Sequence, residues 1–181
     1  RTYALTIFGD MDVSTIKERP KGRQKIDTFV KKNSEIKEVL GMMYEELKNK
    51  HQVYVIAPLI EESENSDLNT VNELRDQMKL AFGEKYKIDI VHGKMASGAK
   101  DLIMDQFKKN EVQILISTTV VEVGVDVTNA TTMVIFDADR FGLSQLHQLR
   151  GRVGRNSLQS YCFLISDKDK ERLNIMEKEQ K

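Results

Sequence analysis

Cysteine is almost absent from this sequence, since Cys162 is the only one among 181 residues. One cysteine cannot build a disulfide framework or a zinc site, and Cys162 stands inside an apolar run, so we expect a small buried residue. No apolar run reaches the roughly 18 residues of a membrane-spanning helix, and no N-terminal signal pattern is present. We therefore expect a soluble, cytoplasmic protein with no membrane partner.

An excess of charge of either sign is also absent. The 28 basic and 28 acidic side chains cancel, so no overall field attracts the chain to nucleic acid or to a membrane surface. Any contact with nucleic acid must come from a local patch or from backbone amides. With 40% hydrophobic and 31% charged residues, the composition is that of an ordinary globular domain, and the length fits one domain or one domain with an appendage.

Two parts of a complete ATPase site are missing as well. The phosphate-binding pattern G-x-x-x-x-G-K-[ST] does not occur, since Gly93-Lys94-Met95 lacks both the leading loop and the hydroxyl. No Asp-Glu pair closes an apolar strand to hold Mg²⁺. We therefore expect no metal ligands in this chain and no ATP hydrolysis by the chain alone.

From residue 26 onward, apolar runs of strand length alternate with helical periods. The expected strands are 26–32, 53–59, 87–92, 113–118, 132–137 and 160–166. The expected helices begin at a cap on Asn33 or Ser34, at the capping box Thr70–Glu73, at Ser97, at Leu143 and after Asp167. The third should stop near Asn110 and the fourth near Gly154, and the acidic segment 61–67 should form a solvated loop.

The apolar runs are continuous rather than alternating, which predicts strands buried on both faces of a mostly parallel sheet. Helices must then cover both faces, which gives a three-layer α/β fold. Ligands of such sheets bind beyond the carboxyl ends of the strands, where His92, Thr118, Thr119 and Asp137 are expected. Residues 1–25 do not show this alternation of strands and helices and are expected to be a connector. Because the chain starts with arginine, it is expected to be a piece of a longer protein.

Two arginines and a glutamine are expected on one face of the fourth helix. At roughly 100° per residue, Gln148, Gly151, Arg152 and Arg155 share one arc, with the apolar residues of the helix opposite. A fixed pair of guanidinium groups suits the charge of a transferring γ-phosphoryl group. Arg150 lies about 200° from Gln148 on the helical wheel and is expected to be a salt-bridge or lobe-interface residue.

A second group of polar residues follows the strand expected at 113–118. The hydroxyls of Thr118 and Thr119 can bond to a phosphodiester, Gly124 lets the backbone approach a ligand, and Asp126 can accept from a ribose hydroxyl. His92 ends the preceding strand, but no Ser, Cys or paired carboxylate lies at a nucleophile-like spacing from it, which favours a structural or backbone-contacting histidine over a general base.

These segments resemble motifs of superfamily 2 helicases. Residues 141–155 are similar to motif VI and residues 117–126 to motif V, most closely those of the RecG type. Arg1-Thr2 resembles the end of motif III, and three further segments resemble RecG-type sequences, namely 5–14, 57–64 and 91–95.

The resemblance implies a second RecA-like helicase domain at 26–181, with a P-loop-NTPase-type fold that lacks the P-loop, preceded by an inter-lobe segment at 1–25. Arg152 and Arg155 would contact the γ-phosphate of ATP, and Gln148 would help to place the nucleotide or couple it to the helix. Gly124 and Asp126 would line the nucleotide cleft, while Thr118 and the His92-Gly93 loop would contact the DNA backbone. Mg²⁺ and most phosphate contacts would come from the first lobe.

The activity implied is that of an ATP-dependent DNA helicase that remodels branched DNA, by fork reversal and Holliday-junction branch migration, in recombination and repair. Duplex or branched DNA, the first RecA-like lobe and a DNA-wedge domain of the same parent chain are the implied partners. Two alternatives remain open: the second lobe of a transcription-repair coupling factor, or a non-catalytic RecA-like binding module.

Overall fold

A single parallel sheet forms the middle of the molecule. The computed structural model describes residues 26–57, 64–92, 95–118, 127, 129–153, 158–168 and 170–178, and the expected inter-lobe segment 1–25 lies outside them. The strands of the described part are β1 (Ile26–Lys31), β2 (Gln52–Ile56), β3 (Ile88–Val91), β4 (Ile114–Ser117), β5 (Ala130–Phe136) and β6 (Ser160–Ile165). Their order is β1-β6-β5-β2-β4-β3, and every neighbouring pair is parallel. All the expected strands are present, with ends that differ by a few residues.

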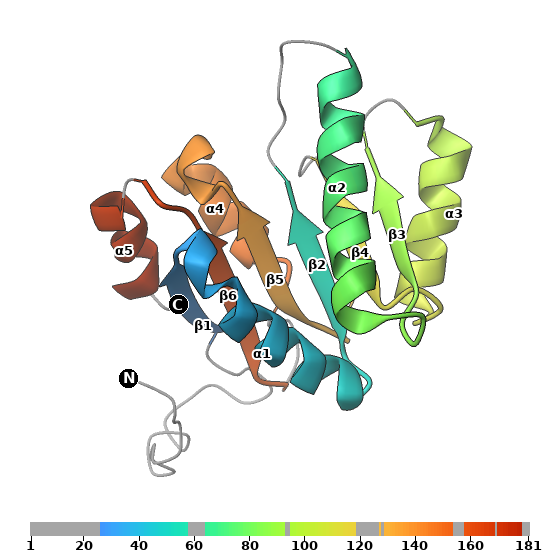
Figure 1. The fold of residues 1–181 in the computed structure, drawn as a ribbon, viewed down its shortest axis with the longest axis horizontal. Helices are drawn as coiled ribbons and strands as arrows, with labels where there is room; N and C mark the ends of the chain where they lie inside the picture. The colour runs from blue at the N-terminus through green and yellow to red at the C-terminus, as the bar shows by residue number, and fades with distance from the viewer. Residues whose placement is uncertain are drawn as a thin grey trace.

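Helices cover both faces of this sheet. They are α1 (Ile36–Lys48), α2 (Glu64–Phe82), α3 (Ser97–Lys108), α4 (Leu143–Arg150) and α5 (Lys170–Lys178). One core cluster joins α1 and α2 to the sheet, and the other joins α3, α4 and α5 to the opposite face. Figure 1 shows α1 and α2 in front of the sheet and α4 behind it. The three-layer α/β fold is therefore confirmed.

The alternation of side chains along the strands divides the core between the two faces. On β2, Val53 and Val55 belong to the cluster under α1 and α2, whereas Tyr54 and Ile56 belong to the other. The ring of Tyr54 meets Phe107 of α3 edge to face, with centroids 4.9 Å apart. Each fully buried large apolar side chain contributes roughly 1.5–3 kcal/mol, so hydrophobic burial on two faces is the main source of stability.

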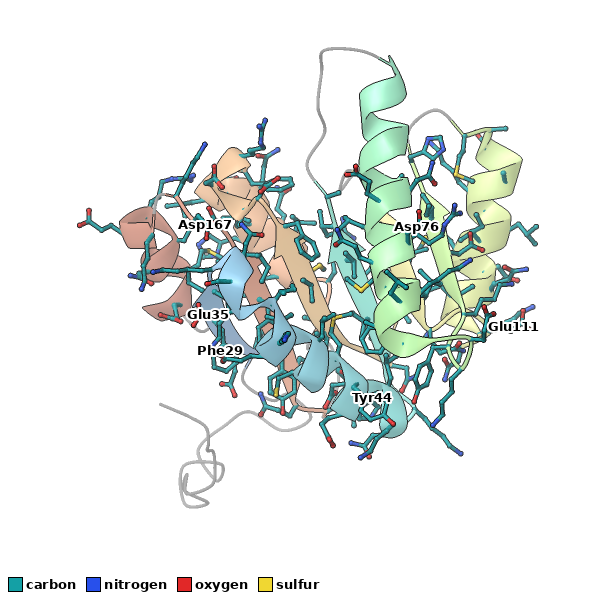
Figure 2. The ribbon with its side chains drawn as sticks, viewed as in Figure 1. Phe29, Glu35, Tyr44, Asp76, Glu111 and Asp167 are labelled. Atoms are coloured by element: carbon teal, nitrogen blue, oxygen red, sulfur yellow. The ribbon has the colours of Figure 1, made fainter. Side chains whose placement is uncertain are left out.

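The start of α1 differs from the expectation. Neither Asn33 nor Ser34 caps the helix, because residues 33–35 form a 3₁₀ turn and α1 begins at Ile36 without a side-chain capping bond. Asn33 instead donates to the carboxylate of Asp167, from its backbone N at 3.1 Å and from Nδ2 at 2.9 Å. These bonds join the segment after β1 to the segment after β6, where Figure 2 labels Glu35 and Asp167. Asn33, which could have capped α1, thus bonds instead to the segment that follows the neighbouring strand β6.

The expected start of α2 was wrong. The helix begins at Glu64, so the Thr70–Glu73 sequence lies inside it and does not open it, and residues 64–67 are helical rather than a loop. Acidic residues are favourable near a helix N-terminus, so the composition that suggests a solvated loop is also compatible with a first helical turn. The inward face was predicted correctly, because Val71, Leu74 and Met78 are buried.

The fourth helix is shorter than expected. It ends at Arg150 instead of about Gly154, and the chain continues as tight turns in which the N–H groups of Arg152 and Val153 bond to carbonyls three residues earlier. Glycine is a poor helix former, which favours an end at Gly151. The apolar side is as predicted, since Leu146, Leu149 and Val153 are buried.

Candidate functional site

The carboxyl ends of the parallel strands meet at one edge of the sheet, the upper edge in Figure 1, toward which the arrowheads of β2, β3 and β5 point. In the register of β3 and β4, Val91 lies opposite Ser117. The next residues, His92 and Thr118, therefore emerge side by side. The structure thus brings together two of the residues predicted to contact DNA, while Gly93 lies outside the described residues.

Thr118 has an unusual environment for a hydroxyl. It is fully buried, and its Oγ1 has no hydrogen-bond partner. An unpaired buried polar group costs about 1–3 kcal/mol, and such groups in native proteins call for an explanation. A phosphodiester oxygen could supply the missing partner, although the hydroxyl would first have to become exposed. The contact of Thr118 with DNA stays a prediction.

The turn between β5 and α4 places the start of α4 at the same edge. Asp137, directly after β5, has a left-handed backbone with φ 50°, which aspartate tolerates better than most residues. A 3₁₀ turn follows at Ala138–Arg140. The backbone N of Gly142 then donates to Oε1 of Gln145 at 2.9 Å, which satisfies one free amide at the start of α4.

Arg172 of α5 fixes this turn from the side. It donates to the carbonyl oxygens of Phe141 at 3.0 Å and Asp139 at 2.7 Å. The hydroxyl of Ser166, directly after β6, also donates to the Asp139 carboxylate. The start of α4 is therefore held by α5 and by the end of β6, and no sequence pattern indicated either contact.

Gln148 and Arg152 carry the chemistry predicted for this region. Gln148 is exposed on α4, and Arg152 is half-buried in the turn after it. Within the described part of the chain, neither side chain makes a hydrogen bond or an ion pair. The guanidinium group of Arg152 carries five N–H donors that can bind an oxyanion such as a phosphate. Arg155, Gly124 and Asp126 lie outside the described residues, so their roles stay predictions.

Arg150 is buried, which contradicts one of the two roles expected for it, that of a lobe-interface residue. It is 4% exposed, and its guanidinium group is enclosed within this lobe, so it cannot lie at a surface between lobes. Nη1 donates to Oγ1 of Thr28 on β1 at 3.1 Å and to the carbonyl of Met176 on α5 at 2.8 Å, and Nη2 lies 3.2 Å from Nδ1 of His147. The helical phase of Arg150, on the side of Leu146 and Leu149, was a sequence signal for this burial.

Cys162 lies in the same part of the core and is buried, as predicted. Burial raises the pKa of its thiol to about 12, although the nearby charge of Arg150 acts in the opposite direction. A thiol held so firmly in its protonated form is a weak nucleophile, which fits a packing role.

The described residues contain no group of three or more His, Cys, Asp or Glu side chains arranged to hold a metal ion. None of the helices among them is long and apolar enough to cross a membrane.

Residues 31–157 match the family model described as the helicase conserved C-terminal domain, which is more than half of the chain. The chain belongs to this helicase family. Among solved structures, a RecG bound to a three-way DNA junction is 36% identical, with a TM-score of 0.69 over 88% of this chain and 20% of that one. Domain 2 of the DEAD-box helicase Mss116p, at 20% identity and a TM-score of 0.62 over 79% of this chain and 55% of that one, shows the RecA-like fold alone.

Curated relatives of this helicase domain carry the name ATP-dependent DNA helicase RecG. That of Bacillus subtilis is 51% identical over 97% of this chain and 26% of the relative, and that of Staphylococcus epidermidis is 54% identical over 92% of this chain and 24% of the relative. The chain therefore spans about a quarter of the length of these relatives. The resemblance of the sequence motifs to RecG-type helicases is confirmed.

Proposed function

We propose that this chain is the second motor lobe of a RecG-type, ATP-dependent DNA helicase that remodels branched DNA in recombination and repair. The observation that carries the proposal is Arg152, which is half-buried, has no partner among the described residues and follows the end of α4 on one face of a RecA-like sheet. The similarity to RecG helicases over most of the chain supports the choice of substrate.

The arrangement supports a role in stabilising charge on a nucleotide bound between two lobes. ATP with Mg²⁺ supplies the γ-phosphoryl group, and the metal and most phosphate contacts would be provided by the first lobe. Arg152, together with Arg155, would donate to the γ-phosphoryl oxygens as negative charge develops on them. Gln148 would orient the nucleotide, and Gly124 and Asp126 would line the ribose side of the cleft.

The DNA contacts proposed for this lobe lie at the neighbouring strand ends. Thr118 and the His92-Gly93 loop would bind the sugar-phosphate backbone, which fits a motor that moves along DNA without reading its sequence. Closure and opening of the two lobes during ATP turnover would then move this edge of the sheet along branched or duplex DNA. A DNA-wedge domain of the same parent protein would separate the strands.

Replacement of Arg152 in the full-length parent protein tests the proposal. Arginine fingers typically contribute about 10³–10⁵-fold to kcat, or roughly 4–7 kcal/mol. We expect Arg152→Ala to reduce single-turnover ATP hydrolysis by that factor while fork binding remains nearly intact. Arg152→Lys should rescue poorly, since an ammonium group cannot reproduce the planar fork of donors.

Lys37→Ala provides a control, because Lys37 is an exposed cation on α1, on the other face of the sheet. It should hydrolyse ATP at the wild-type rate. If Arg152→Ala retained more than about a tenth of wild-type turnover, the loss would be under about 1.4 kcal/mol, and the assignment of Arg152 as a finger would be wrong.

A further inference from the structure

A buried hydrogen-bond network joins the end of α4 to two other elements of the lobe. Arg150, the last residue of α4, bonds through Nη1 to the Thr28 hydroxyl of β1 and to the Met176 carbonyl of α5. Its Nη2 atom lies 3.2 Å from Nδ1 of His147, and that nitrogen accepts because a guanidinium group can only donate. One side chain thus fastens α4 to a strand and to a second helix.

This network lies beside the turn that carries Arg152. The carbonyl of Arg150 accepts from the N–H of Val153 at 3.2 Å, and the carbonyl of Leu149 accepts from the N–H of Arg152 at 2.9 Å. The direction in which Arg152 leaves the turn therefore depends on where the last residue of α4 is held. That residue is held at its side chain by β1 and α5.

Burial of an arginine at this position costs free energy. A charged group taken from water loses its hydration, and an apolar side chain of similar volume often gives equal or greater stability. What the guanidinium group adds is direction, because its planar donors fix the positions of their acceptors relative to one another. The need for a fixed geometry at the end of α4 therefore explains the presence of an arginine here better than stability alone does.

We propose that Arg150 is a positioning residue for Arg152: its hydrogen bonds to Thr28 and Met176 hold the end of α4 so that the finger meets the γ-phosphoryl group in the productive orientation. The inference rests on the proposed function, and it assigns a role that the helical wheel did not indicate. It also connects α5 to catalysis, since any displacement of α5 at Met176 is transmitted to the end of α4.

Substitution of Thr28 tests the positioning role of Arg150 without removing a buried charge. It is 1% exposed on β1, an edge strand that contributes no predicted site residue. Thr28→Val keeps the shape of the side chain and removes one acceptor of Arg150, while the Met176 carbonyl remains. Thr132→Val is the matched control, because Thr132 is an equally buried threonine on β5 whose Oγ1 has no hydrogen-bond partner. Arg150→Ala itself could simply fail to fold.

The experiment measures DNA-stimulated ATP hydrolysis and thermal unfolding in the full-length parent protein. Misplacement of a catalytic group by about 1 Å can reduce the rate by about 10²-fold, so we expect Thr28→Val to lower kcat by roughly 5- to 20-fold with KM for ATP within about twofold of wild type. Thr132→Val should change neither. In single-turnover assays on an Arg152→Ala background, Thr28→Val should have no further effect, because the residue through which it acts is gone.

Two results would overturn the inference and leave the proposed function standing. One is a kcat of Thr28→Val within about twofold of wild type in a protein whose Arg152→Ala variant is inactive. The other is a loss caused by Thr28→Val that is equally large with and without Arg152. If Arg152→Ala retained turnover, the proposed function and the inference would fall together.

Discussion

Arg150 and Arg152 lie in different environments, although only Gly151 separates the two residues. Arg150 is buried and bonds to Thr28 and Met176, whereas Arg152 is half-buried and has no partner within the described chain. The end of α4 between them explains the contrast, because the chain leaves the helix with one arginine on the apolar side and the other beyond it. A buried arginine with a structural role and an arginine proposed to bind phosphate thus stand within one short motif.

The isolated chain should not hydrolyse ATP. Its sequence lacks the phosphate-binding loop and the acidic pair for Mg²⁺, so it would offer only Arg152, Arg155 and the ribose side of a cleft. The measurement is ATP turnover by the purified chain, with and without branched DNA, with Arg152→Ala as the control for contaminating ATPases. DNA-stimulated turnover that disappears in the Arg152→Ala variant would contradict this prediction.

Binding of DNA to the isolated chain should be weak, independent of sequence and sensitive to salt. The chain has no net charge, and the predicted contacts at Thr118 and the His92-Gly93 loop address phosphates rather than bases. Fluorescence anisotropy over a salt series should give a log–log slope of roughly −1 to −3, which corresponds to one to three phosphate contacts. Tight binding that persists in high salt, or that distinguishes base sequences, would refute the assignment.

Gly151 offers a way to separate folding from function. A Cβ atom added there would lie 3.5 Å from the carbonyl oxygens of Gln148 and His147, an ordinary contact, and the φ of −68° suits any residue. Gly151→Ala should therefore leave the thermal unfolding of the lobe unchanged or slightly raised. If the nucleotide approaches between Gln148 and Arg152, the same change in the full-length protein should raise KM for ATP or lower kcat by about tenfold or more. Unchanged kinetics would mean that no ligand comes close to this backbone.

The stability of the chain should fall in alkaline solution. Burial raises the pKa of Cys162 from 9.0 to about 12, and the pKa of Tyr161 rises from 10.0 to about 12 through burial and then the charges of Glu46 and Asp27. The unfolded chain releases these protons at lower pH than the folded chain does. The stabilisation is therefore complete below about pH 9 and is lost as the pH rises toward 12.

Thermal unfolding between about pH 8 and pH 11 measures this effect. In the Cys162→Ala variant, the fall in stability that begins near the pKa of the unfolded thiol should be absent. In the Tyr161→Phe variant, the fall that begins near the pKa of the unfolded phenol should be absent. A thiol reagent should label Cys162 only after unfolding. Rapid labelling of the native chain at about pH 8 would show that the thiol is accessible.

The order and type of the elements could be predicted from the sequence because they depend on local patterns. Runs such as 114–117 are apolar enough to be read as strands buried on both faces, and Val71, Leu74 and Met78 show the helical spacing of an inward face. Positions at strand ends follow from the same patterns. That is why His92 and Thr118 could be placed at one edge of the sheet before their pairing was known.

The contacts that hold the site could not be predicted, because they join residues far apart in the chain. Arg172 bonds to the carbonyls of Asp139 and Phe141, and those acceptors carry no side-chain signature at all. At the opposite edge of the sheet, Glu46 accepts from Thr131 and lies 3.0 Å from Nδ1 of His51, an arrangement that no spacing rule indicates. Composition also misled at the start of α2, where an acidic segment is equally compatible with a loop and with a helix N-terminus.

The position of β1 has a consequence for how the chain is made. It is the first described strand in the sequence, yet its only partner in the described sheet is β6, with Ile26 opposite Ser160. Val30 and Asn33 likewise bond to residues 147 and 134 positions further on, Glu177 and Asp167. A ribosome that synthesises this segment at about 5–20 residues per second therefore releases β1 several seconds before β6 exists. During that interval β1 has no strand of the described sheet to pair with. This edge of the sheet can form only after β6, its last strand, has been made.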